Sequence, residues 1–187
     1  MIAEDFRVHY RRKRRGMNPP LAFVTTLLMP GLHAILVYRF GHWVSRRGVV
    51  LKVLLLPLYT VLSLAVQATW GIEIGRQAKL GKGVKIIHQN GIVIADFAEI
   101  GDNCLIMQGV TIGHSGRGRN NGVPVIGNQV RICSGAKVIG KIRIGNNVTI
   151  GANAVVHKDL PDGVTAVAYP GFKIIDSDSE YRDAEGE

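Results

Sequence analysis

The sequence predicts a mainly β fold, a parallel β-helix of six-residue units preceded by an N-terminal α-helical segment. Aliphatic residues recur at six-residue intervals in three runs, 74–86, 94–112 and 126–156. Glycine directly follows many of them, and a small or branched residue stands four positions after them. A short fixed period indicates a solenoid, and six residues fit one flat side of a triangular coil. We therefore expect the aliphatic side chains to stack inside, each coil to stabilise its neighbours, and glycine to permit the corners.

The N-terminal segment, residues 1–71, is basic at its start. Residues 1–52 contain ten Lys and Arg residues but only two acids, Glu4 and Asp5. The pentad 11-RRKRR-15 has no interleaved aromatic residues and no nucleic-acid-binding module around it, so a nucleic-acid partner is not expected.

Two apolar stretches follow the basic pentad. The stretch 21–40 is split at Pro30, and the stretch 49–70 is long enough to cross a bilayer. We expect helices that pack on the rest of the protein or on sister subunits. The alternative is contact with a membrane surface, with the pentad on anionic lipid head groups.

The six-residue period is interrupted twice. The step from Ile86 to Ile94 is eight residues and contains His88. The step after Ile112 is fourteen residues and contains an extruded loop, 113–125. Insertions in a tight solenoid are pushed outward and are often functional, so both interruptions predict a site.

We place the β-helix domain at 72–160 and a C-terminal extension at 161–187. The last twelve residues are acidic, and we expect them to form a disordered tail. The two cysteines, Cys104 and Cys133, lack metal-type spacing, so no metal is expected, and this cysteine usage favours a reducing cytoplasm.

Four stretches give a more specific signal: 32-LHAILVYRFGHWV-44, 72-IEIGRQAKLGKGVKIIHQNGIVI-94, 108-QGVTIG-113 and 132-ICSGAKVIGKIRIGNNVTIGANAVV-156. Together they resemble the serine acetyltransferase family of hexapeptide-repeat acyltransferases, in a shortened form found in bacterial polysaccharide clusters. The resemblance implies a left-handed β-helix and an acetyl-CoA-dependent O-acetyltransferase. It makes His88 the general base and Glu73, fifteen residues earlier, the carboxylate that orients it. Such a pair can take the proton of an alcohol as its oxygen attacks a thioester.

The resemblance also implies a homotrimer that binds acetyl-CoA in the groove between two subunits. The small residues Ser134, Gly135 and Ala136, then Gly151 and Ala152, would admit the pantetheine arm. Lys158 would bind a phosphate. The alternative is that these small residues serve only the corner geometry.

The chain departs from the family where the amino-acid substrate would bind. Ile87 replaces an Asp before the catalytic His, and Gly122 with Val123 replaces an Arg-His pair. We therefore expect the acceptor to be a sugar hydroxyl of an exopolysaccharide or capsule precursor, bound with the help of His114 and Asn90.

Two alternatives stay open. The first is a serine O-acetyltransferase of cysteine biosynthesis that uses other acceptor contacts. The second is a non-catalytic scaffold for membrane-associated biosynthetic partners, which the acidic end 184-AEGE-187 disfavours because the family's partner-binding tail ends in isoleucine. The expected location is the cytoplasm, at the inner face of the membrane if the basic segment contacts lipid.

Overall fold

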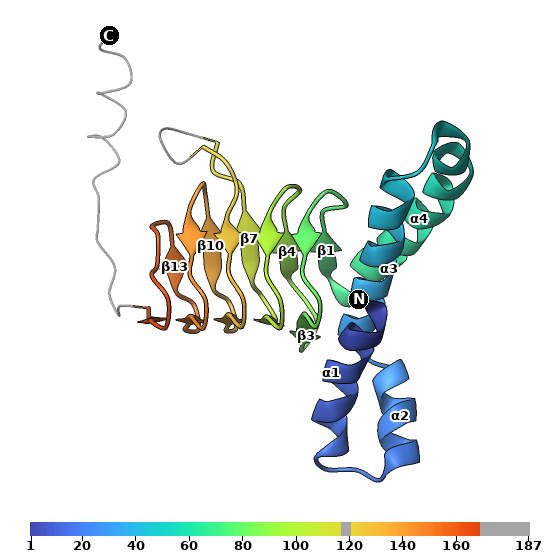
Figure 1. Ribbon diagram of the computed structural model, residues 1–187, viewed down its shortest axis with the longest axis horizontal. Coiled ribbons are helices and arrows are strands. Elements are labelled where there is room, and N and C mark those ends of the chain that lie inside the picture. Colours follow the sequence, from blue (N-terminus) through green and yellow to red (C-terminus); the bar gives the residue numbers. More distant parts are fainter. Residues whose placement is uncertain (117–120, 169–187) are drawn as a thin grey trace.

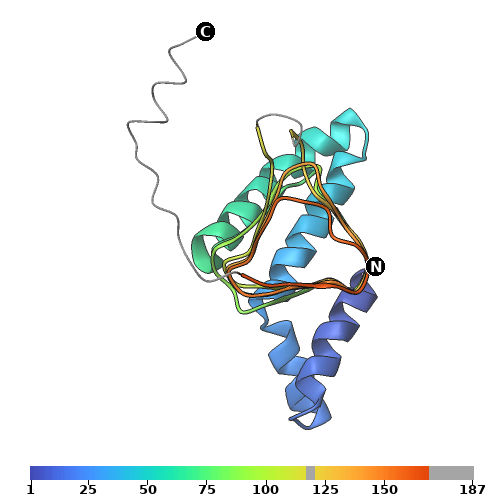
Figure 2. The same ribbon diagram turned by 90° about the vertical axis from the view of Figure 1, so that its left-hand side faces the viewer.

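A computed structural model describes residues 1–116 and 121–168 of the chain. Five stacked triangular coils form a β-helix, and helices lie across the end where the β-helix begins (Figure 1). The view along the solenoid shows the coils superimposed as a triangle, with the helices extending beyond it (Figure 2). The parallel β-helix predicted from the six-residue period is therefore confirmed.

Three parallel sheets form the sides of the triangle. Side A contains β1 (Ile72–Ile74), β4 (Ile92–Ile94), β7 (Thr111–Gly113), β10 (Lys137–Ile139) and β13 (Val155–Val156). Side B contains β2 (Lys79–Leu80), β5 (Glu99–Ile100), β8 (Val125–Ile126) and β11 (Arg143–Ile144). Side C contains β3 (Lys85–Ile87), β6 (Leu105–Met107), β9 (Arg131–Ile132), β12 (Thr149–Ile150) and β14 (Thr165–Ala166).

The pairing register stacks the predicted aliphatic residues directly on one another. On side C, Ile86 pairs with Ile106, Ile106 with Ile132, and Ile132 with Ile150. All four side chains are buried. Successive coils thus bury one continuous column of aliphatic side chains, the main source of stability in a solenoid.

The glycine that directly follows the aliphatic residue has a different role from the one predicted. A Cβ added to Gly75 would lie 2.5 Å from the backbone nitrogen of Asp96, and one added to Gly101 would lie 2.5 Å from the carbonyl oxygen of Gly127. These glycines therefore let adjacent coils approach. The left-handed backbone that turns a corner falls two residues later, as at Asn103 (φ 58°) and Gln129 (φ 57°).

The fifth coil continues beyond residue 160, where we placed the end of the domain. Leu160 bridges to Ile144 and β14 pairs with β12, so the predicted boundary falls inside this coil. Mutual backbone hydrogen bonds between Ser115 and Gly122 close the base of the extruded loop. Residues 117–120 of that loop and the predicted acidic tail lie outside the described residues.

The N-terminal segment forms α1 (Ile2–Arg14), α2 (Pro19–Leu27), α3 (Pro30–Ser45) and α4 (Val49–Trp70). The apolar stretches correspond to α2 with α3 and to α4, and α1 is a further helix in the basic start of the predicted helical segment 1–71. Within the described part of the chain, α4 is long and apolar enough to cross a membrane. Helices α2 and α3, which are bent by 56° relative to each other, pass the same test if they are counted together as one broken span.

Helix α3 closes the open end of the first coil. The Tyr38 hydroxyl donates to the carbonyl oxygen of Ala78 (2.5 Å), and the Arg39 guanidinium donates to the carbonyl oxygens of Leu80 (2.5 Å) and Gly81. These bonds satisfy backbone acceptors that the first coil would otherwise leave unpaired.

A buried ion pair ties α1 to the same place. Asp5 is fully buried, and its carboxylate accepts hydrogen bonds from Arg39 Nε (3.1 Å) and the backbone nitrogen of Gly83 (2.8 Å). Both charges are removed from water, so each is stable only while its charged partner and its hydrogen bonds are present.

Candidate functional site

The first interruption of the period is a two-residue bulge at the edge where side C turns into side A. The backbone nitrogens of Gly109, Gly135 and Asn153 donate to the carbonyl oxygens of Asn90, Gln108 and Ser134, each at 2.9 Å. Asn90 therefore takes the place in the first coil that Gln108 and Ser134 take in later coils. The two extra residues are His88 and Gln89.

The bulge is held in an unusual backbone conformation. A regular corner has one left-handed residue, whereas this one has three: His88 (φ 57°), Asn90 (φ 101°) and Gly91 (φ 66°). A left-handed conformation costs about 1–2 kcal/mol for a residue with a side chain. Strained positions of this kind are characteristic of functional sites. The result is that His88 is exposed on the outside of the solenoid.

Glu73 lies beside this bulge. It is exposed on β1 and in register with Val93, which is on the strand that follows the bulge. A Cβ added to Gly71, two residues before Glu73, would lie 2.5 Å from the Asn90 side-chain oxygen. Within the described residues, however, no hydrogen bond joins the Glu73 carboxylate to the His88 ring.

Most of the residues that the resemblance assigns to acetyl-CoA share this edge. We call it the C–A edge and define it as residues 88–91, 108–109, 134–135 and 151–153. Ser134 and Gly135 are half-buried there, and Ala152 is exposed. Ala136 is different, because its side chain is fully buried in the core and does not reach the surface.

Two other predicted residues lie away from the C–A edge. His114 follows β7 and Lys158 follows β13, so both stand where side A turns into side B. Both are exposed. Within one chain, therefore, the width of side A separates them from His88.

Sequence reasoning missed two polar groups at the C–A edge. The side-chain oxygen Oε1 of Gln108 is buried without a hydrogen-bond partner in the described structure. The Lys137 ammonium donates to the carbonyl oxygen of Gly109 (2.6 Å) and to Thr111 Oγ1 (3.0 Å). Gln108 could have been found from its spacing, because it stands two residues after its aliphatic residue, as Ser134 does.

The described residues contain neither an activated cysteine nucleophile in the core nor a metal cluster. Burial raises the pKa of the Cys104 thiol to about 11, so this side chain is not a nucleophile at neutral pH. Within residues 1–116 and 121–168, no group of three His, Cys, Asp or Glu side chains could hold a metal ion.

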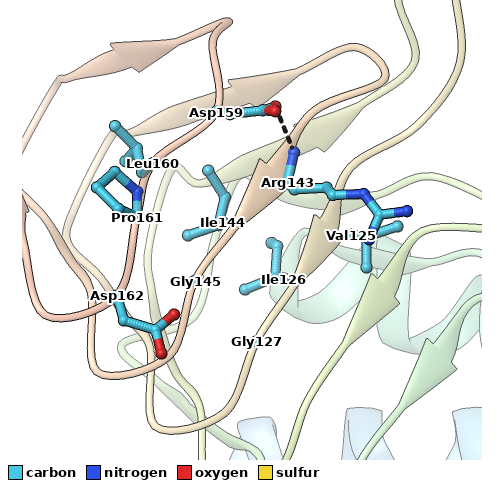
Figure 3. Close-up of a pocket in the computed structure, with 10 residues that line it drawn as sticks. All are labelled: Val125, Ile126, Gly127, Arg143, Ile144, Gly145, Asp159, Leu160, Pro161 and Asp162. Carbon is cyan, nitrogen blue, oxygen red and sulfur yellow. Dashed lines mark hydrogen bonds between the residues drawn. The ribbon is translucent and has the colours of Figure 1, made fainter.

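A separate groove of about 520 Å³ lies on side B, opposite the C–A edge (Figure 3). The segment 159–162 forms one wall, and β8 and β11 form the other. The Asp159 carboxylate accepts a hydrogen bond from the backbone nitrogen of Arg143 (2.8 Å), which fixes that wall. The groove contains none of the predicted site residues.

Comparisons with known proteins agree with this architecture. The family model "Bacterial transferase hexapeptide (six repeats)" matches residues 124–158. A serine acetyltransferase of Helicobacter pylori is 44% identical over 141 residues, which are 75% of this chain and 79% of that protein. A serine acetyltransferase of Synechococcus elongatus is 39% identical over 171 residues, which are 91% of this chain and 66% of that protein.

A solved structure extends the comparison. The serine acetyltransferase of Brucella abortus in complex with coenzyme A superposes with a TM-score of 0.76 at 29% identity. The superposition covers 90% of this chain and 64% of the Brucella chain. The predicted fold class, a left-handed β-helix with an N-terminal helical segment, is thereby confirmed. The chain spans slightly less than two thirds of both the Synechococcus and the Brucella proteins.

Proposed function

Because the chain belongs to the serine acetyltransferase family of hexapeptide-repeat transferases, we propose that it transfers an acetyl group from acetyl-CoA to a hydroxyl, with L-serine as the leading acceptor. The observation that carries this proposal is the bulge of His88 and Gln89. It presents an imidazole on the same edge as Ser134 and Gly135, the small residues assigned to the acyl donor.

His88 would act as the general base. An imidazole is well suited to accept the proton of an acceptor hydroxyl near neutral pH while the oxygen attacks. Glu73 would hold the other ring nitrogen and stabilise the imidazolium. Glu73 is on β1, beside the strand that follows the bulge, and a change of side-chain rotamer on substrate binding would bring the pair together, since catalytic hydrogen bonds often tighten only in the complex.

The C–A edge fits the proposed donor. Acetyl-CoA, when bound, supplies an activated thioester acyl group and a thiolate leaving group. The small residues Ser134, Gly135 and Ala152 leave room for an extended chain beside the backbone. Gln108 Oε1 is a buried acceptor without a partner in the described structure, and a donor group of a ligand would satisfy it.

We propose a homotrimer as the active form. His114 and Lys158 lie at the far end of side A from His88, so a complete site that includes them needs residues of a neighbouring copy. Sedimentation should give a mass of three chains of 20.3 kDa. A monomer with full activity would contradict this arrangement.

The relatives favour serine over the sugar hydroxyl that the sequence analysis placed first. One observation still supports a sugar as the second candidate. Ile87 is buried where the resemblance expects an acidic side chain for the amino group of serine, and Gly122 with Val123 provides no charge for its carboxylate.

The test is the release of coenzyme A thiol from acetyl-CoA in the presence of L-serine or a panel of sugars. We expect serine-dependent release, with kcat lower by about 10²- to 10⁴-fold in His88→Ala. The matched control is Gln89→Ala, which changes the neighbouring exposed residue and should keep kcat within a few-fold of the wild-type value. Release with sugars alone would select the second candidate. Unchanged turnover in His88→Ala, or no release with any acceptor, would overturn the enzyme proposal and favour the scaffold alternative.

A further inference from the structure

The helical layer exposes an unusual amount of apolar surface. On α4, Tyr59 and Val66 are buried, but only 6% of the apolar window of the helix is buried overall. Its exposed large apolar residues are Val49, Val50, Leu51, Val53, Leu54, Leu58, Val61, Leu62 and Leu64. Helix α2 adds Leu21, Phe23, Val24 and Leu27, each about half exposed. Apolar surface exposed along most of a helix, as on α4, marks an interaction face.

This face has a defined place in the molecule. The helices form a layer at the end of the solenoid opposite the C-terminal coils (Figure 1). Figure 1 also shows the α1–α2 turn and the α3–α4 turn at opposite ends of this layer. Both turns are basic, with Arg14 and Arg15 at the first and Arg46 and Arg47 at the second. Apolar surface is therefore flanked by cations at both ends.

Beyond Asp5, the charged residues of the layer are all of one sign. Residues 6–72 contain ten Lys and Arg residues and no Asp or Glu. Within the described residues, only Arg7 and Arg39 of this group form ion pairs, with Glu4 and Asp5. Among residues 1–116 and 121–168 the other cations of this group have no acidic partner, so an anionic partner would stabilise the layer.

A groove of about 460 Å³ beside α1 concentrates this charge. Arg11, Arg12 and Arg15 line it together with Lys85 of β3. Burial, together with repulsion from Arg12, Arg131 and Arg15, lowers the pKa of the Lys85 ammonium. Cations held this close without a counter-ion are costly, so the groove also favours an anionic partner.

The charge pattern decides between two occupants of the apolar face. A second copy would bring the same unpaired cations against the first copy, and like charges repel. A bilayer containing anionic phospholipid offers apolar chains for α2 and α4 and phosphates for the flanking cations. The side chains at the α3–α4 turn suit a lipid–water interface, because the Arg47 guanidinium stacks on the exposed ring of Trp43 at 4.5 Å.

We propose that the helical layer docks on an anionic phospholipid membrane, with α2 and α4 in the plane of the interface and the basic turns on lipid phosphates. Helix α4 would lie on the membrane surface and not cross the bilayer, because it packs along α3. Helix α3 is itself fixed to the β-helix, since Tyr38 and Arg39 are hydrogen-bonded to the first coil. The docking would keep the C–A edge at a fixed distance from the bilayer, whatever the acceptor.

Vesicle flotation of the full chain tests this proposal. We expect the protein to float with vesicles of phosphatidylcholine mixed with phosphatidylglycerol, and to float far less with phosphatidylcholine alone or at high salt. Arg46→Gln with Arg47→Gln should weaken partitioning roughly 30-fold. The charge-matched control, Lys141→Gln with Arg143→Gln on the β-helix, should keep wild-type partitioning.

A second pair of variants tests the apolar contact. Val50→Gln with Val61→Gln replaces two side chains that are 81% and 65% exposed, so the fold should persist while flotation falls. The control is Val125→Gln with Val155→Gln, two exposed residues of the β-helix, and it should float normally. The proposal is overturned if wild-type protein fails to float or if controls and test variants lose flotation equally. It is also overturned if the α4 variants instead dissociate an assembly in sedimentation, because the face would then be an interface between copies. Flotation does not depend on catalysis, so its outcome is independent of the proposed activity.

Discussion

Deletion of His88 and Gln89 should leave the β-helix folded and abolish catalysis. The hydrogen bonds from Gly109, Gly135 and Asn153 make Asn90 the counterpart of Gln108 and Ser134. Without the two extra residues, Ile86 and Ile94 would be six residues apart, and the first coil would have the same spacing as the regular corners.

The expected change in stability follows from the backbone. The deletion removes His88 from the left-handed region and lets Asn90 adopt the regular backbone of Gln108, so that Gly91 turns the corner alone, as Gly109 and Gly135 do. A left-handed residue with a side chain costs about 1–2 kcal/mol, so the free energy of unfolding should stay the same or rise by that amount. Loss of the general base should lower turnover by at least about 10²-fold.

Urea denaturation and the thiol-release assay together check this prediction. The control deletion removes Asn128 and Gln129 from a regular corner, which leaves a four-residue unit and displaces Ile132 from the core column. Loss of one buried Ile costs about 2–5 kcal/mol, so this control should be strongly destabilised. The reasoning is refuted if the His88–Gln89 deletion is as unstable as the control, because the bulge would then be part of the regular coil.

Three further predictions concern buried polar groups. Asp5→Ala should lower the free energy of unfolding by about 3–5 kcal/mol, because it leaves Arg39 buried without its partner; urea denaturation measures this. Burial lowers the pKa of His9, so between that lowered value and 6.5 the unfolded chain binds a proton that the folded protein does not. Stability should therefore fall as pH drops through this window, and His9→Gln should flatten the dependence of the melting temperature on pH. The Cys104 thiol, with its pKa raised to about 11, should resist a thiol reagent at pH 8 until the protein unfolds, whereas Cys133, which is half-buried, should react first.

Each of these has a clear contrary result. A loss below about 1 kcal/mol in Asp5→Ala would mean that water enters the pair. An unchanged pH profile in His9→Gln would assign the acid sensitivity to other groups. Reaction of Cys104 in the folded protein, located by mass spectrometry, would show that the first coils open readily.

The six-residue period was enough to predict the β-helix, its inward residues and the two interruptions. This follows because each coil contacts only its neighbours, so the core pattern repeats at short range along the chain. Ile132, for example, packs between Ile106 and Ile150, and each of the three is visible in the sequence as a member of a six-residue run. The same spacing identified His88 as a residue outside the regular pattern.

The tertiary structure decided what no periodicity could show. It placed Asn90, Gln108 and Ser134 in one line, left Gln108 Oε1 without a partner in the described structure, and separated His114 and Lys158 from that edge. From the sequence, we assigned the glycines that directly follow the aliphatic residues to the corners. The structure shows that the short distance between adjacent coils is what requires them.

The position of the helices was also decided at long range. Helix α1 is rich in charged residues, and a pair of charges, Asp5 and Arg39, holds it on the first coil. These two residues are 34 positions apart and on different helices, so only folding reveals their contact. The sequence determined what repeats locally. The fold decided which distant polar groups meet, because a buried charge is stable only where its partner and its hydrogen bonds are brought together in space.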